Sequence, residues 1–250
     1  MDPLAVHKSR TQTSRILLSE IISALSFALD ATEGALPGHS LRCCLLGMRI
    51  GVAVGLGKQE LGSLYYALQL KDAGCSSNAA RMSAMIGGGD ERVLKNASKL
   101  TDWTRSSRPD LRYLRELWRQ SRPGASFTER VLHLYRLAIS PENNTEQMMA
   151  LRCERGAAIA QHLQLGTAVS EAVRSLDEHW DGSGYPEGKR GTDIPLLSRI
   201  CSIAQHLDAY AVAGNPNFAV KALRTSRKAW YDPQLIAAVS SLHKAGRLWQ

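Results

Sequence analysis

The chain has 250 residues, 44% of them hydrophobic, with 31 Lys and Arg against 23 Asp and Glu, for a formal net charge of +8. This apolar content excludes a disordered chain, and no run approaches the roughly 18 apolar residues of a membrane span. The five cysteines are odd in number and none lies in a CxxC spacing, which favours buried free thiols in a reducing compartment over a disulfide framework or a cysteine-based metal site.

Apolar residues recur at helical spacing along nearly the whole chain, and no segment alternates as a strand does. Glycine and proline breaks separate expected helices at 13–30, 39–54, 58–72, 77–86, 127–139, 145–163, 167–180, 196–212, 216–227 and 232–246. The polar, basic stretch 90–122 is expected to form one or two exposed helices. The sequence therefore predicts an all-α protein with a single domain over 1–250. It comprises an N-terminal helix within 1–35, a core over 36–212 with a 90–122 insertion, and C-terminal helices over 213–250.

The positive charge favours phosphate-bearing ligands or acidic partners. Arginines cluster over 105–122, where they either dock an acidic partner or form a solvated helix face. The chain has no nucleic-acid motif and no interleaving of aromatic and basic residues, so nucleic-acid binding is not expected. The N-terminal residues lack the apolar stretch of a signal peptide. We therefore expect a cytoplasmic protein without membrane attachment.

One stretch, residues 179–208, reads HWDGSGYPEGKRGTDIPLLSRICSIAQHLD and stands out from the rest. Gly182 and Gly184 are free to take positive φ, and Tyr185-Pro186 fixes the exit of the loop. Pro195 then opens a helix with apolar residues at helical spacing. The pattern predicts a specific loop leading into a buried helix.

This stretch resembles the signature of the HD-GYP family, bacterial metal-dependent phosphodiesterases that hydrolyse cyclic di-GMP. The triplet Gly184-Tyr185-Pro186 gives the family its name, and the resemblance covers roughly residues 36–212. It implies a multi-helix HD-domain-like bundle with a GYP loop. In the family, histidines and aspartates from neighbouring helices bind metal ions, which activate water and stabilise charge on the phosphate.

The metal positions of the family are mostly replaced in this chain. His39 resembles the first ligand, and Lys71-Asp72 stands where the family has His-Asp, with Cys75 in place of the catalytic lysine. Arg152 replaces a ligand histidine, and Gln205 replaces the aspartate that closes the first site. Of the seven ligand positions only two match, namely His39 and Asp72; the full set is 39, 71, 72, 152, 176, 177 and 205.

Two of these replacements have the same electrostatic effect. Lys71 and Arg152 place fixed positive charges where metal ions would lie, and they are able to satisfy Asp72 and Asp177 without metal. The resemblance therefore favours an inactive HD-GYP signalling module that needs no cofactor and in which the remnant positions Lys71, Asp72 and Cys75 have no catalytic role. Such a module would bind a cyclic dinucleotide, a diguanylate-cyclase-type protein or another signalling protein.

The residues expected to contact that ligand or partner lie on the loop and beside the pocket: Arg152, Asp181, Gly182, Gly184, Tyr185, Pro186 and Arg199. An equally weighted alternative is that the loop serves folding alone. In that case Asp181 caps a turn, and Arg199 pairs with Asp181 or Glu178 instead of a phosphate.

Two further interpretations stay open. The first is an enzyme, a phosphohydrolase of the cyclic di-GMP phosphodiesterase type with a reduced site. Its one divalent transition metal (Fe, Mn, Ni or Zn) would be held by His39, Asp72 and Asp177. The second is a purely structural or dimerising fragment of a larger signalling system, for example a homodimer, which would show neither ligand nor metal. Bound metal and its loss in Asp72→Ala distinguish the enzyme from the binding module and from the structural fragment.

Overall fold

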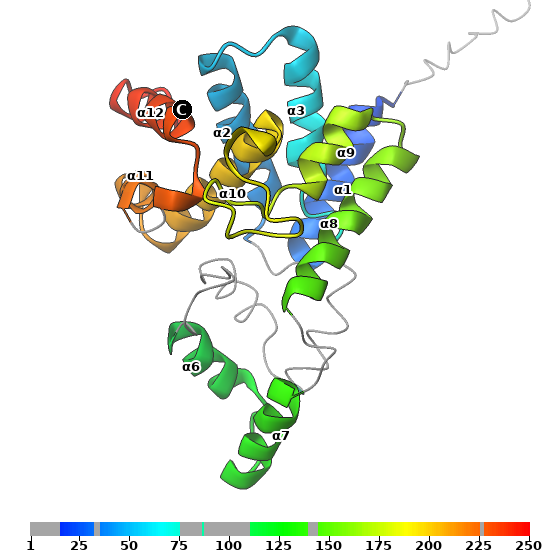
Figure 1. Cartoon of the computed structure of the whole chain (residues 1–250), viewed down its shortest axis with the longest axis vertical. Coiled ribbons are helices and arrows are strands. Elements are labelled where there is room, and N and C mark those ends of the chain that lie inside the picture. Colours follow the sequence, from blue (N-terminus) through cyan, green and yellow to red (C-terminus); the bar gives the residue numbers. More distant parts are fainter. Residues whose placement is uncertain (1–15, 33–35, 76–86, 88–110, 140–144, 226–227) are drawn as a thin grey trace, which may run out of the picture.

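The computed structural model describes residues 16–32, 36–75, 87, 111–139, 145–225 and 228–250, and within these ranges every regular element is a helix (Figure 1). The predicted all-α class is confirmed. The predicted helix at 77–86 and much of the 90–122 insertion lie outside the described residues. The α-helices are α1 (Leu18–Thr32), α2 (His39–Ala53), α3 (Lys58–Leu70), α6 (Leu111–Gln120), α7 (Phe127–Ile139), α8 (Thr145–His162), α9 (Thr167–Arg174), α10 (Leu196–Ala213), α11 (Pro216–Thr225) and α12 (Pro233–Lys244).

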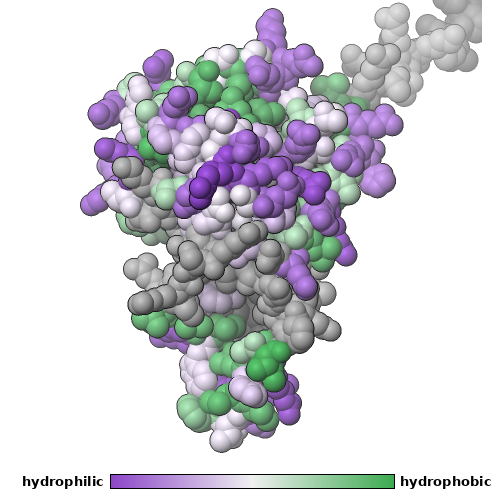
Figure 2. Space-filling view, in the orientation of Figure 1, coloured by the Kyte–Doolittle hydropathy of each residue, from purple (hydrophilic) through white to green (hydrophobic). Residues whose placement is uncertain are grey.

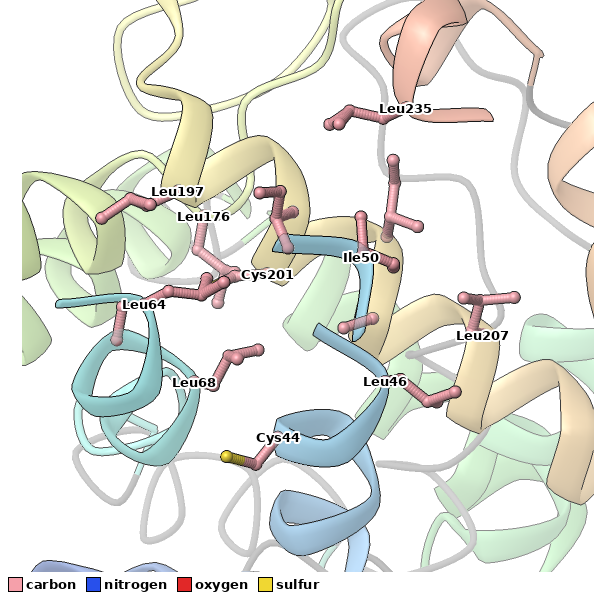
Figure 3. Packing of buried hydrophobic residues seen from close by; sticks show 14 of the residues in the cluster. Cys44, Leu46, Ile50, Leu64, Leu68, Leu176, Leu197, Cys201, Leu207 and Leu235 are labelled. Carbon is pink, nitrogen blue, oxygen red and sulfur yellow. The ribbon is translucent and has the colours of Figure 1, made fainter. Parts of the chain in front are cut away.

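Helix α10 is the centre of the bundle and packs against α2, α3, α9 and α11. Its apolar stripe is buried because each member meets a neighbouring helix, and burial of one such side chain contributes about 1.5–3 kcal/mol. Figure 3 shows side chains from α2, α3 and α10 converging with others from the loops and α12; those labelled are Cys44, Leu46, Ile50, Leu64, Leu68, Leu176, Leu197, Cys201, Leu207 and Leu235.

Glycines let two pairs of segments approach closely. A Cβ added at Gly47 of α2 would lie 2.6 Å from Leu68 of α3. At Gly74, just after α3, an added Cβ would lie 1.9 Å from the carbonyl oxygen of Arg152 in α8. The backbones of the two segments therefore touch at Gly74, which brings the end of α3 against α8 and sets their flanking polar residues side by side.

The predicted helix over 167–180 is wrong in its second half, because α9 ends at Arg174. The backbone of residues 175–180 turns to meet the glycine-rich loop instead. The carbonyl oxygen of Asp177 accepts a hydrogen bond from the Tyr185 amide at 3.0 Å. Gly184 packs so tightly there that an added Cβ would lie 2.4 Å from the same oxygen.

Helices α6 and α7 lie at one end of the molecule, away from α10 (Figure 1). None of the residues of α7 described here is buried, and Figure 2 shows hydrophobic side chains gathered at this end. The exposed large apolar residues of the two helices are Leu111, Leu114, Phe127, Val131, Leu132, Tyr135 and Ile139. In the described part of the chain, no helix has the length and apolar character needed to cross a bilayer.

Candidate functional site

His39, the first residue of α2, joins three parts of the bundle. Its buried imidazole places Nδ1 2.6 Å from Oδ2 of Asp208 on α10 and Nε2 3.0 Å from Nζ of Lys71 at the end of α3. An ammonium group only donates, so Nε2 accepts and the ring proton assigned to Nδ1 is donated to Asp208. The surrounding charges therefore fix the tautomer and the orientation of the ring.

Asp208 is a site residue that the sequence analysis did not identify. It is buried and accepts hydrogen bonds from Arg42 Nε at 2.5 Å and Arg42 Nη2 at 3.2 Å, in addition to the one from His39. Burial opposes its negative charge, but the hydrogen bonds from His39 and Arg42 outweigh that effect and hold the pKa of Asp208 below its usual value. The sequence did carry one signal for Asp208: it is a carboxylate next to Leu207, within the apolar stripe of a helix predicted to be buried.

Lys71 and Asp72 form a buried ion pair next to His39. The Lys71 side chain has no exposed surface, and its ammonium contacts Oδ2 of Asp72. Burial opposes the charge on Lys71, yet the field of Asp72 prevails and raises the pKa of Lys71. Cys75 Sγ lies 3.9 Å from Asp72 Oδ1, so the three remnant positions are neighbours.

Arg152 and Asp177 form the second ion pair, with Arg152 Nη2 2.9 Å from Asp177 Oδ1. Burial again opposes the charge, and Asp177 outweighs it, so the pKa of Arg152 is raised well above its ordinary value. Cys153 Sγ lies 3.5 Å from the other carboxylate oxygen, and burial raises the pKa of this thiol. Both cations predicted to satisfy Asp72 and Asp177 therefore face those carboxylates.

Of the metal set expected from the sequence, His39 and Asp72 lie close together, with Nε2 3.9 Å from Oδ2, whereas Asp177 pairs with Arg152. Among the described residues, His39, Cys43 and Asp208 bring one ligand atom each to within 4.8 Å of one another. Cys43 lies one turn after His39, with Sγ 3.6 Å from Nδ1. The family positions that carry Asp72 and Asp177 hold ion pairs instead.

An imidazole, a thiol and a carboxylate are good ligands for a transition metal such as zinc, so the donor set fits one ion in type and spacing. Binding would require the Cys43 thiolate and would compete with Lys71 at His39 and with Arg42 at Asp208. The positions of Lys71 and Arg152 do not fit a metal, because each already carries a charge of the same sign.

The glycine-rich loop is docked onto the body of the protein. The amides of Trp180 and Asp181 donate to the carbonyl oxygens of Trp230 and Ala229 at 2.9 and 3.1 Å. Asp181 caps the turn, accepting from the amide and hydroxyl of Ser183. The interpretation of Asp181 as a turn cap thus has direct geometric support.

The two glycines of the loop are required for different reasons. Gly182 has φ of 80°, as predicted, whereas Gly184 is not at positive φ and is needed for its close approach to residues 177–179. Tyr185 is only 8% exposed, so its ring is part of the core rather than an outward-facing contact, and the peptide to Pro186 is cis. Glu178 accepts from the amides of Glu187 and Gly188 and holds the far side of the loop.

Arg199 pairs with neither Asp181 nor Glu178, so that expectation is wrong. Its Nη1 donates to Oδ2 of Asp232 at 2.6 Å, and its guanidinium lies over the Trp180 ring, 5.5 Å from the centroid. Asp232 is also the N-cap of α12. Arg199 therefore connects α10, the loop and α12, and a phosphate would have to compete with Asp232 for it.

Comparison with known proteins identifies several relatives of this chain. The family model described as HD domain matches residues 88–235, a range that includes Arg152, Asp177 and Asp208 and begins after Lys71. The chain is 36% identical over 225 residues to the 3′3′-cGAMP-specific phosphodiesterase 3 of Vibrio cholerae, covering 90% of this chain and 48% of that protein.

Two further matches agree. The cyclic di-GMP phosphodiesterase response regulator RpfG of Xanthomonas campestris is 27% identical over 205 residues, with 73% of this chain and 47% of that protein covered. The crystal structure of the V. cholerae cyclic GMP-AMP phosphodiesterase V-cGAP3 superposes with a TM-score of 0.67 at 35% identity, covering 92% of this chain and 50% of that one. The chain spans about half the length of these relatives.

Proposed function

Because this chain belongs to the HD domain family, in its HD-GYP branch, we propose that it is a cyclic-dinucleotide phosphodiesterase module with a reduced, one-metal site. The substrate class is a 3′,3′-linked cyclic dinucleotide such as cGAMP or cyclic di-GMP, which the names of the relatives support. The observation that carries the proposal is the convergence of three ligating side chains, His39, Cys43 and Asp208, with ligand atoms within 4.8 Å.

In such a site a bound metal would polarise the phosphodiester and supply hydroxide at neutral pH. The residues of the chain set the conditions for that chemistry. Asp208 holds the His39 ring in one orientation. Arg42, whose side chain is 39% exposed, pairs with Asp208 and donates through Nη1 to the carbonyl oxygen of Pro37 at 2.9 Å. By exchanging the exposed Pro37 contact, Arg42 would reach the negative charge of a bound phosphate, as guanidinium groups do in phosphate recognition.

The expectation of an inactive module is less well supported than its alternative. The relatives are named as phosphodiesterases, which favours hydrolysis, and the geometry does not demonstrate loss of activity. The predicted protein partner, homodimer, single domain over 1–250 and cytoplasmic location stay predictions.

A specific observation does favour a second candidate, a module that binds a cyclic dinucleotide without cleaving it. The Lys71–Asp72 and Arg152–Asp177 ion pairs occupy positions where the family binds metal, so they oppose a two-metal site. The two candidates differ in one measurable property, the metal content of the purified protein.

The test is elemental mass spectrometry of protein purified without chelator or affinity-tag metal, combined with a chromatographic assay of 3′,3′-cGAMP and cyclic di-GMP cleavage. The hydrolase interpretation predicts about one equivalent of a transition metal in the wild-type protein. It also predicts that metal and cleavage are lost together in His39→Ala and in Asp208→Asn. Asp193→Asn, at an exposed carboxylate in the loop, is the matched control.

Metal-free protein that binds the dinucleotide without cleaving it would establish the second candidate and overturn the first. Metal-free protein that neither binds nor cleaves it would leave the structural or dimerising module, which size-exclusion chromatography with light scattering would then examine.

A further inference from the structure

A pocket of about 390 Å³ is lined by residues of α11 and α12, and none of them belongs to the His39 site. One face of α11 supplies most of its lining, at positions i, i+3, i+4, i+7 and i+8, and α12 supplies the remainder. The lining residues are Asn217, Val220, Lys221, Arg224, Thr225 and His243.

The described residues that line the pocket include two cations, Lys221 and Arg224, and no carboxylate. Within the described ranges, no ion pair joins Lys221 or Arg224 to an aspartate or glutamate, whereas Lys71, Arg152 and Arg199 are each paired. Two cations without a counter-charge on one helix face create a local positive potential that attracts anions.

A chain of hydrogen bonds orients the neutral side of the pocket. Trp249 Nε1 donates to His243 Nδ1 at 3.0 Å, so the imidazole proton lies on Nε2, which donates to Asn217 Oδ1 at 2.9 Å. The amide oxygen of Asn217 is therefore engaged, so the NH₂ group is what this side chain can offer to a ligand. With Lys221 and Arg224, the lining residues carry three kinds of hydrogen-bond donor: an amide, an ammonium and a guanidinium.

We propose that this pocket binds a phosphate monoester of mononucleotide size. Convergent donors without a carboxylate match a phosphate, and a volume near the lower end of the roughly 300–1,000 Å³ range of ligand pockets suits one nucleotide better than two. Val220, which is buried, offers an apolar contact for the organic part of the ligand. The site is separate from the proposed catalytic one and does not depend on it.

Isothermal titration calorimetry of the full chain tests the proposal, with AMP as the probe and adenosine and inorganic phosphate as comparison ligands. AMP is expected to bind saturably and more tightly than either comparison ligand. Lys221→Ala combined with Arg224→Ala is expected to weaken AMP binding about a hundredfold, because each charge-assisted hydrogen bond is worth about tenfold in affinity.

The control Lys58→Ala with Arg155→Ala removes two exposed positive charges elsewhere and is expected to leave AMP affinity unchanged within about twofold. Asn217→Asp provides a second variant that keeps the acceptor for His243 while placing a negative charge in the pocket, and it should abolish binding. The proposal is overturned if wild-type protein shows no saturable AMP binding. It is equally overturned if adenosine or phosphate binds as tightly as AMP, or if the control loses affinity as the pocket variants do.

Discussion

The Lys71–Asp72 ion pair should behave as a coupled unit when it is mutated. Lys71→Met keeps the length of the side chain but leaves the Asp72 carboxylate, only 10% exposed, without its buried counter-charge. Asp72→Asn keeps the shape and one acceptor oxygen but leaves the fully buried ammonium of Lys71 without a counter-charge. Breaking a buried pair from one side costs about 3–5 kcal/mol, so each single variant should lose about 3 kcal/mol or more of the free energy of unfolding.

The double variant removes both charges together and should lose less than the two single variants combined. Because neither desolvated charge is stranded, the coupling energy should be at least about 2 kcal/mol. Urea unfolding followed by tryptophan fluorescence measures all four proteins. The exposed pair Arg174–Glu187, at 3.2 Å with side chains 48% and 41% exposed, is the matched control, and its alanine cycle should give less than about 1 kcal/mol. Additive losses at Lys71 and Asp72, within about 0.5 kcal/mol, would refute the electrostatic argument.

Three other outcomes follow from packing and burial. Gly74→Ala should destabilise the protein by more than about 3 kcal/mol in thermal unfolding, because the added Cβ would meet the Arg152 backbone. Gly62→Ala, with nothing within 4 Å of the added Cβ, should be neutral or stabilising by up to about 1 kcal/mol. Equal effects of the two substitutions would contradict the close approach at Gly74. Glu178→Ala should speed hydrogen exchange at the Gly188 amide, because the acceptor of that amide is lost. Glu178→Gln keeps an acceptor oxygen, so exchange should rise less than in the alanine variant. Equal exchange rates in the two variants would disprove the role of the Glu178 oxygen. All five cysteines are buried, so a thiol reagent such as DTNB should label less than about one thiol in native protein and all five in urea; rapid native labelling would count against this burial.

The sequence was sufficient for most of the described helices and for the place of the loop. Apolar spacing predicted α7 over the residues it occupies and α10 to within one residue of its observed end, because these helices follow a single buried or amphipathic stripe. It failed at residues 175–180, where the helical pattern continues but the backbone carbonyl of Asp177 is taken by Tyr185. A contact between distant backbone groups leaves no periodic signal.

The contacts of the candidate site were predictable where this chain carries a charged residue in place of a family metal ligand. They were not predictable where two residues meet only through the packing of helices. Lys71 and Arg152 carry charges opposite to those of Asp72 and Asp177, so their pairing followed from chemistry. Asp208 was missed because it is separated by 169 positions from His39, and only the crossing of α2 and α10 brings the two together. Arg199 was assigned the wrong partner for the same reason, since Asp232 reaches it only through the placement of α12.

The fixed cations of Lys71 and Arg152 also differ from metal ions in how they are supplied. A metal bound by a protein exchanges with the cell and can be withheld by scarcity or removed by a chelator. An ammonium and a guanidinium are part of the polypeptide, so they are present from synthesis and cannot dissociate. At these two positions the charge balance of the interior is the same in a metal-starved cell as in a replete one. Folding of the bundle around Asp72 and Asp177 therefore does not require a metal ion.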